Sequence, residues 1–126
     1  MDQYIEQTEV IEPIQHDEPE ENYRLVLSTV KGTYFFLPAE IVRLEARSNY
    51  TQIYFSNHHP MITSRVLKEY EALLEPHGFL RTHRSHLVNK NMVVEVDSKG
   101  KLVMQDQSTA EISRRKKNKV MKALRA

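Results

Sequence analysis

The sequence predicts a mainly antiparallel β domain with one internal helix, and three observations lead to this fold class. Short runs rich in β-branched and aromatic residues recur along the chain at regular spacing. Clusters of glycine, asparagine, serine and proline separate these runs. Residues 64–75 alone inside the domain show the clear three- and four-residue apolar spacing of an amphipathic helix. The apolar face of such a helix needs a sheet to cover.

Five strands are expected before this helix. They cover residues 24–30, 33–37, 41–46, 50–55 and 61–63. Lys31-Gly32 predicts a hairpin turn between the first two strands, and Pro38 ends the second strand. Arg47-Ser48-Asn49 interrupts the pattern between the third and fourth strands.

The helix is expected to begin at Ser64 as its N-cap and to end at Pro76 and Gly78. Three further short strands are expected at residues 92–97, 101–104 and 109–112. Near the C-terminus, Val120 and Leu124 could form the apolar side of a short basic helix.

The composition limits the class of protein. A chain of 126 residues is long enough to bury a hydrophobic core without cross-links to stabilise it. The absence of cysteine excludes disulfides and thiolate metal sites. No apolar run approaches the roughly 18 residues of a membrane span. The first thirty residues lack a signal-peptide pattern. We therefore expect a soluble, cytoplasmic protein with no membrane partner.

The net charge of +1 averages two unlike segments. Eight of the 17 acidic residues lie in residues 1–22, which contain no lysine or arginine. The 18 basic residues therefore face nine acidic ones from Tyr23 onward, which gives this part a net charge of +9. We expect residues 1–22 to form an acidic linker or disordered leader and residues 23–126 to form the domain. The leader could also compete with a polyanion for the basic face.

The central stretch, residues 79–89, places a polar cluster between apolar flanks. Residues 81–86 offer two guanidiniums, two imidazoles and two hydroxyls. Burial of so many polar groups would be costly, so most of the cluster should face solvent or a polyanion. The apolar flanks predict that a core clamps both ends and presents the polar centre rigidly as a loop or strand end.

A second basic cluster follows at the C-terminus. Residues 113–126 contain seven lysines and arginines and no acid. Either cluster alone could be a solvated surface, but together they predict a site for nucleic acid.

Several segments, in this order, resemble one known family. They are Leu44-Glu45-Ala46, Ser48-Asn49-Tyr50, the helical Leu67, Tyr70 and Leu74, the block at residues 79–89 that reads F-x-R-x-H-R-S-x-x-V-N, residues 94–97, and Ile112-Ser113-Arg114. Over about residues 24–125 the chain resembles the LytTR (LytR/AlgR-type) DNA-binding domain of bacterial response regulators.

The resemblance implies an elongated stack of short antiparallel sheets, about ten strands in all, that reads the major groove of duplex DNA through loops. It also implies the output domain of a two-component transcription regulator. The expected partners are repeated promoter sites, a second copy of the chain bound to the same DNA, and a receiver domain N-terminal in a longer chain. No receiver pattern precedes the domain here, so a stand-alone regulator remains an alternative.

The resemblance assigns base contacts to Tyr50, Arg84 and Arg114. A guanidinium fork matches the guanine O6 and N7 acceptors, which independently favours the two arginines. Phosphate contacts are expected, from the resemblance or from charge, at Arg47, Asn49, Arg81, His83, Ser85, Asn89, Lys90, Arg115, Lys116 and Lys117.

Some of these residues also have structural interpretations. Arg81 could pair with Glu75 or Glu95, Tyr50 could be a half-buried sheet aromatic, and Asn89 could bond the local backbone. The charges of residues 115–117 could serve solubility alone.

Two other function classes are less well supported. His83 and His86 suggest a metal, but residues 79–90 contain no acidic ligand, and Ser85 has no orienting acid for a catalytic triad. We expect no enzyme, metal or cofactor. A basic module that binds protein or RNA without sequence-specific DNA reading is the remaining alternative, although no RNA-binding aromatic pattern is present.

Overall fold

The computed structural model describes residues 9–10 and 22–126, and these residues form three antiparallel sheets with two α-helices. The strands are β1 (Glu9–Val10), β2 (Leu25–Thr29), β3 (Gly32–Phe36), β4 (Ile41–Arg47), β5 (Tyr50–Phe55), β6 (Met61–Thr63), β7 (Phe79–His83), β8 (His86–Asn89), β9 (Val93–Val96), β10 (Leu102–Met104) and β11 (Thr109–Ala110). The helices are α1 (Leu67–Leu74) and α2 (Lys117–Arg125).

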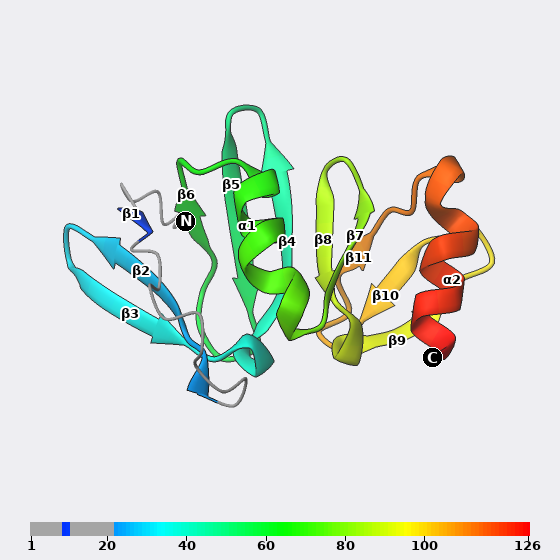
Figure 1. The fold of residues 1–126 in the computed structure, drawn as a ribbon, viewed down its shortest axis with the longest axis horizontal. Helices are drawn as coiled ribbons and strands as arrows, with labels where there is room; N and C mark the ends of the chain where they lie inside the picture. Colours follow the sequence, from blue (N-terminus) through cyan, green and yellow to red (C-terminus); the bar gives the residue numbers. More distant parts are fainter. Residues whose placement is uncertain (1–8, 11–21) are drawn as a thin grey trace.

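The three sheets follow one another along the long axis of the molecule (Figure 1). The central sheet has the strand order β6-β5-β4-β8-β7, and the flanking sheets have the orders β1-β2-β3 and β11-β10-β9. This confirms the expected elongated, mainly β architecture built from short antiparallel sheets.

The predicted first hairpin forms, but its turn lies one residue earlier than expected, at Val30-Lys31, and Gly32 begins β3. Leu25 and Leu27 alternate inward and are fully buried. Thr29 pairs with Gly32 across the turn. Strand β3 ends at Phe36, and a 3-10 turn, η2 (Pro38–Glu40), begins at the proline that was expected to stop the strand.

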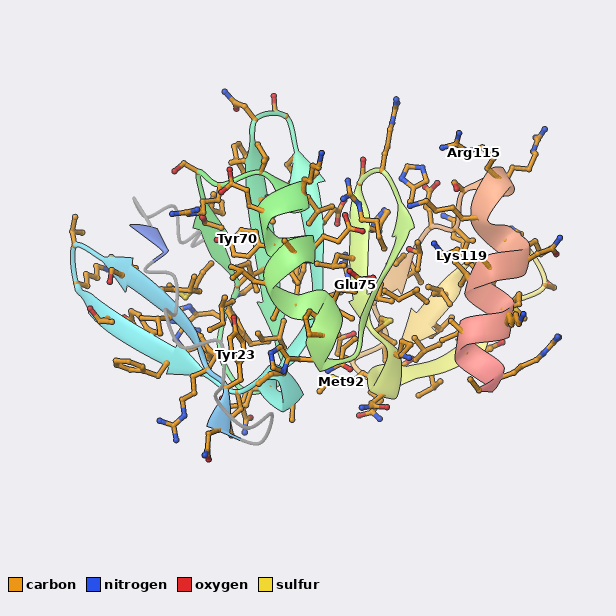
Figure 2. The ribbon with its side chains drawn as sticks, viewed as in Figure 1. Tyr23, Tyr70, Glu75, Met92, Arg115 and Lys119 are labelled. Atoms are coloured by element: carbon orange, nitrogen blue, oxygen red, sulfur yellow. The ribbon has the colours of Figure 1, made fainter. Side chains whose placement is uncertain are left out.

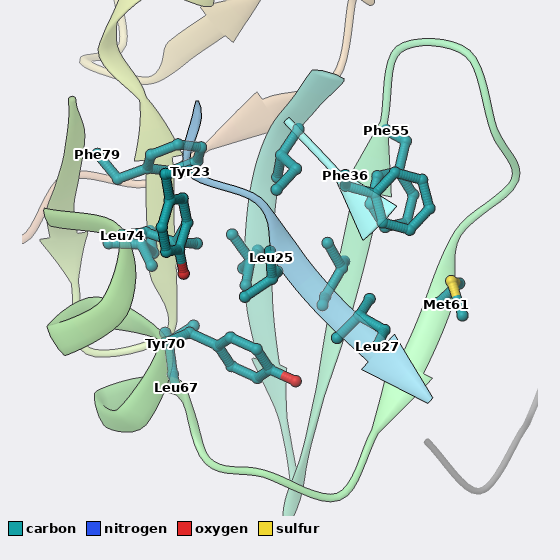
Figure 3. Close-up of a cluster of buried hydrophobic side chains, with 14 residues drawn as sticks. Tyr23, Leu25, Leu27, Phe36, Phe55, Met61, Leu67, Tyr70, Leu74 and Phe79 are labelled. Carbon is teal, nitrogen blue, oxygen red and sulfur yellow. The ribbon is translucent and has the colours of Figure 1, made fainter. Parts of the chain in front are cut away.

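Helix α1 covers one face of the central sheet, and its apolar side shares the larger core with residues of β2 and β3 (Figure 1). Its buried residues Leu67, Tyr70 and Leu74 pack with leucines of β2 and with Phe79 (Figure 3). The Tyr70 hydroxyl donates a hydrogen bond of 2.7 Å to Thr63 Oγ1, which satisfies its polar end inside the core. The helix is therefore fixed against β6 at the edge of the central sheet.

The smaller core lies between the central and third sheets. Val42, Val88, Leu102, Met104 and Ala110 form it, and Leu124 of α2 packs against them. Val120 is also fully buried, which confirms the expected apolar side of the C-terminal helix.

The helix boundary was predicted too early. Ser64 is exposed and outside the helix, whose N-cap is Val66 without a side-chain capping bond. Thr51 Oγ1 donates to the Arg65 carbonyl at 2.7 Å, and Arg65 N donates to Thr63 Oγ1 at 3.2 Å. These bonds hold the chain against the sheet through Arg65, so that helical turns begin only at Leu67.

The last predicted strand is also shorter than expected, because β11 ends at Ala110. The Thr82 hydroxyl donates to the Glu111 carbonyl at 2.8 Å, and Ser113 N donates to the Thr82 carbonyl at 2.8 Å. The chain therefore leaves the third sheet and runs along β7.

The acidic segment contributes one strand that the sequence did not predict. Glu9 and Val10 pair antiparallel with Ser28 and Leu27 of β2. The prediction of a linker for the remainder of this segment falls on residues 1–8 and 11–21, outside the described residues.

Neither α1 nor α2 exceeds nine residues, so no helix in the described residues is long enough to cross a bilayer.

Candidate nucleic-acid interface

Three segments that are distant in sequence meet at one edge of the molecule: the β4–β5 turn at residues 48–49, the β7–β8 turn at residues 84–85, and the 3-10 turn η5 (Arg114–Lys116). Ala46 N donates to the Ser85 carbonyl at 2.9 Å and joins the first two segments. The Ser113–Thr82 bond joins the third segment to β7. Both turns and the start of the C-terminal helical segment lie at the upper edge in Figure 1. We call these three segments the basic edge.

The β7–β8 turn is held by the side chain of Arg81. Its Nε donates to the His83 carbonyl at 3.0 Å, and its Nη2 donates to the Arg84 carbonyl at 2.7 Å. Its Nη1 pairs with Glu71 of α1 at 2.7 Å. Arg81 thus fixes the backbone on which the exposed Arg84 side chain is carried.

This geometry revises the prediction for Arg81. The side chain lies mostly buried beneath the turn, and its acidic partner is Glu71 rather than Glu75 or Glu95. An ion pair was the alternative interpretation for Arg81, and one forms, with Glu71 as the partner. Arg81 positions the turn and is not a freely exposed phosphate ligand.

His83 closes the same turn. Its Nδ1 accepts a hydrogen bond of 3.0 Å from Ser85 N, and its Nε2 lies 3.9 Å from Glu111 Oε1. The Ser85 backbone is therefore bonded on both sides, to His83 and to Ala46, which leaves little freedom at the tip of the hairpin.

The β4–β5 turn exposes Arg47, Ser48, Asn49 and Tyr50. Arg47 Nη2 donates to the Tyr54 hydroxyl at 3.3 Å and lies 3.7 Å from Glu45 Oε1. Ser48 has a φ of 56°, in the left-handed region that non-glycine residues seldom adopt. The turn is thus a defined two-residue connection that presents Asn49 and Tyr50 at the basic edge.

In η5, Arg114 and Arg115 are exposed and Lys116 is half-buried. Figure 2 shows Arg115 at the upper end of the C-terminal segment, where η5 leads into α2. Lys116 Nζ lies 3.5 Å from the Arg81 carbonyl oxygen. Burial, with the nearby Arg81 charge, lowers the pKa of Lys116. Arg114 and Arg115 thus lie on the same edge as Arg84, and Lys117 follows them as the first residue of α2.

Two predicted residues lie elsewhere. Asn89 pairs with Phe79 at the end of the hairpin opposite the turn, and Lys90 follows it. Asn89 is 4% exposed. Its Nδ2 donates to the Pro38 and Ile41 carbonyls at 3.2 and 3.0 Å, and its Oδ1 accepts from Asn91 N at 3.0 Å. The contacts favour a structural role for Asn89 over the predicted phosphate contact, but only the bond from Asn91 N is local, because the two carbonyls lie 48 and 51 positions away in sequence. Lys90 is not part of the basic edge.

Arg43 is an organising residue that the sequence did not identify. It is buried in β4, with Nε donating to Ser108 Oγ at 2.9 Å and Nη1 pairing with Glu45 at 3.0 Å. Its guanidinium carbon lies 4.0 Å from the centroid of the Tyr54 ring. In the sequence, the only indication of this role was a single charged residue between the apolar residues Val42 and Leu44. Its partner Ser108 is 65 positions away in sequence, so the contact could not be predicted.

The histidines do not form a metal centre in this part of the molecule. The rings of His83 and His86 are 5.5 Å apart and tilted edge to face. No group of three histidine, aspartate or glutamate side chains with ligand geometry occurs among residues 9–10 and 22–126.

His86 gives the fold a pH dependence. Burial lowers the pKa of His86, although Glu45 opposes the shift. The unfolded chain, with an ordinary histidine pKa of about 6.5, therefore binds more protons than the folded chain as the pH falls through that value. Stability from this residue is complete above about pH 6.5 and is lost below it, until the lower folded-state pKa is passed.

We expect the free energy of unfolding in urea to be lower at pH 5.5 than at pH 7.5, and His86→Gln to reduce this difference. An undiminished difference in His86→Gln would assign the effect to another group.

Comparisons with known proteins agree on one family. Residues 31–125 match the family model of the LytTr DNA-binding domain. A solved structure of the LytTr DNA-binding domain of a protein described as a methyl-accepting/DNA response regulator, from Bacillus cereus, is 25% identical in sequence. It has a TM-score of 0.68 over 80% of this chain and 95% of that chain. A search of the curated proteins found no match.

Proposed function

Because the chain belongs to the LytTr DNA-binding domain family, we propose that it reads specific duplex sequences as the output domain of a bacterial transcriptional response regulator. That it is a DNA-binding domain follows from the family. The sequence-specific reading, the regulatory context and action in the cytoplasm without catalysis are the proposed part.

The observation that carries the proposal is the basic edge itself. It presents Arg84 and Arg114, both exposed, on segments joined by backbone hydrogen bonds. A guanidinium can bond guanine O6 and N7 together in the major groove. We assign base contacts to Arg84, Arg114 and Tyr50, and phosphate contacts to Arg47, Asn49, His83, Ser85, Arg115, Lys116 and Lys117.

The rigidity of the edge supports specific reading. Arg81, His83 and Ala46 bond the backbone of the β7–β8 turn, so little conformational entropy remains to be lost there on binding. The residues that we assign to bases lie in the turns and at the start of β5, and α1 and α2 each bury one side against a core. Turns rather than a recognition helix therefore meet the bases.

Selection of bound duplexes from a random DNA library at low and moderate salt tests the proposal. We expect an enriched motif that persists at moderate salt, since phosphate contacts alone weaken steeply with salt. Repeated half-sites would support binding as a homodimer to promoter repeats. Absence of enrichment, with binding lost on added salt, would favour a nonspecific basic module.

Lys117 provides a separate prediction for the phosphate contacts. Lys117→Ala should weaken binding to cognate and scrambled duplexes by the same factor and lower the salt slope by about one unit. Lys31→Ala, in the β2–β3 turn at the other end of the molecule, is the matched control and should change neither. A loss confined to the cognate duplex would instead make Lys117 a base reader.

The wider partners are proposals of the same kind. The Bacillus cereus relative is named as a domain of a response regulator. We therefore propose that a receiver domain precedes this domain in the working regulator.

A further inference from the structure

A basic groove opens beside the β7–β8 turn, between α1 and η5. Its volume is about 410 Å³. It is lined by the five cationic side chains Lys68, Arg81, Arg84, Arg115 and Lys116, with Glu71 as the carboxylate among the lining residues. The groove thus joins a helix that belongs to the core with two segments of the basic edge.

The charges in the groove are not balanced. The Glu71 carboxylate is engaged by Arg81 at 2.7 Å. Within residues 9–10 and 22–126, Lys68, Arg84 and Arg115 take part in none of the ion pairs. Lys116 is partly desolvated next to Arg81. Several cations facing one hollow favour an anion between them, because a counter-charge relieves their mutual repulsion.

The position of Lys68 is explained by the packing of α1. Leu67, Tyr70 and Leu74 turn one side of the helix into the core. Lys68 and Glu71, three residues apart, share the other side, and Lys68 is exposed. A lysine ammonium on a flexible stem is suited to a phosphate, which needs charge more than a fixed fork.

We propose that this groove seats a phosphodiester group of the bound DNA and that Lys68 is a phosphate-binding residue of the interface. The inference rests on the proposed function. DNA is favoured over a free phosphate ligand because Arg84 and Arg115 belong to both the groove and the basic edge, so a strand crossing the edge passes the groove. Helix α1 then takes part in binding as well as in packing.

Lys68→Gln tests the proposal at an exposed position where both residues have similar helix propensity. Affinity for the selected duplex and for a scrambled duplex should fall by the same factor, and the salt slope should decrease by about one unit. Lys31→Gln is the matched control. If Lys68→Gln changes neither quantity while Arg84→Ala still loses specificity, the groove proposal fails and the proposed function stands.

Duplexes with a single neutral methylphosphonate at successive positions locate the phosphate. The unchanged protein should lose affinity at the phosphate seated in the groove, and Lys68→Gln should be insensitive at that position alone. If the unchanged protein and Lys68→Gln lose the same affinity at each neutralised position, the proposal is overturned.

Binding of inorganic phosphate and of pyrophosphate tests whether the groove is instead a site for a small free phosphate ligand. We expect weak binding that competes with DNA. Tight, Lys68-dependent binding without competition would overturn the DNA assignment in favour of a small-anion site. Failure of the unchanged protein to bind any duplex would overturn both proposals.

Discussion

Arg84→Ala is expected to weaken binding to the cognate duplex by about 1–3 kcal/mol and to relax the sequence preference, the cost of one lost bidentate contact to a base. The residue is exposed at the tip of the β7–β8 turn, so the free energy of unfolding should be nearly unchanged. Competition between cognate and scrambled duplexes at fixed salt measures the effect directly.

Arg84→Lys separates charge from geometry. Lysine keeps the positive charge but lacks the planar fork, so most of the lost discrimination should remain lost. Equal losses on the two duplexes for Arg84→Ala, or full rescue by lysine, would show that Arg84 contacts phosphate.

Asn89→Ala is expected to lower the free energy of unfolding by about 2–4 kcal/mol, because buried backbone groups lose their partners. The amide donates to the carbonyls of Pro38 in η2 and of Ile41, the first residue of β4, and it accepts from a backbone N–H in the 3-10 turn η4 (Lys90–Met92). It thereby joins the start of β4 to the end of β8. Urea denaturation measures the loss.

Asn89→Asp tests the hydrogen bonds more directly than alanine does. Aspartate keeps the side-chain shape and the oxygen that accepts from Asn91 N, but it removes the two N–H groups that donate to the carbonyls. Asn49→Ala, at an exposed asparagine of the β4–β5 turn, should change stability by less than about 0.5 kcal/mol. An Asn89 variant of unchanged stability that has lost affinity for DNA would restore the phosphate assignment.

The strands were predictable because their signals are local. The hairpin signal of Lys31-Gly32, the stop at Pro38 and the alternation in residues 50–55 depend on neighbours in sequence, and the turn was misplaced by one residue only. The error at Ser64 has the opposite origin, because Thr51 holds the chain extended from another strand. Strand β1 was missed since a two-residue strand in an acidic segment leaves no periodic pattern.

The sequence alone could not separate the structural residues of the candidate site from the exposed ones. Residues 79–89 contain Arg81, Arg84 and Asn89, which look equally able to bind a polyanion. Their different roles depend on Glu71 on another element and on carbonyls some fifty positions away in sequence. Those partners exist only after the central sheet has formed.

The pairing of β4 with β8 has a consequence for how the target sequence can change in evolution or by redesign. The β4–β5 and β7–β8 hairpins are neighbours in one sheet, so their tips are separated by about two strand spacings, roughly 10 Å, or about three base steps of DNA. Under the proposed base contacts, we therefore expect substitutions at the tips to alter which bases are preferred while the spacing between the contacts stays constant. A library randomised only at Tyr50 and Arg84 should yield variants with new preferences and unchanged half-site length.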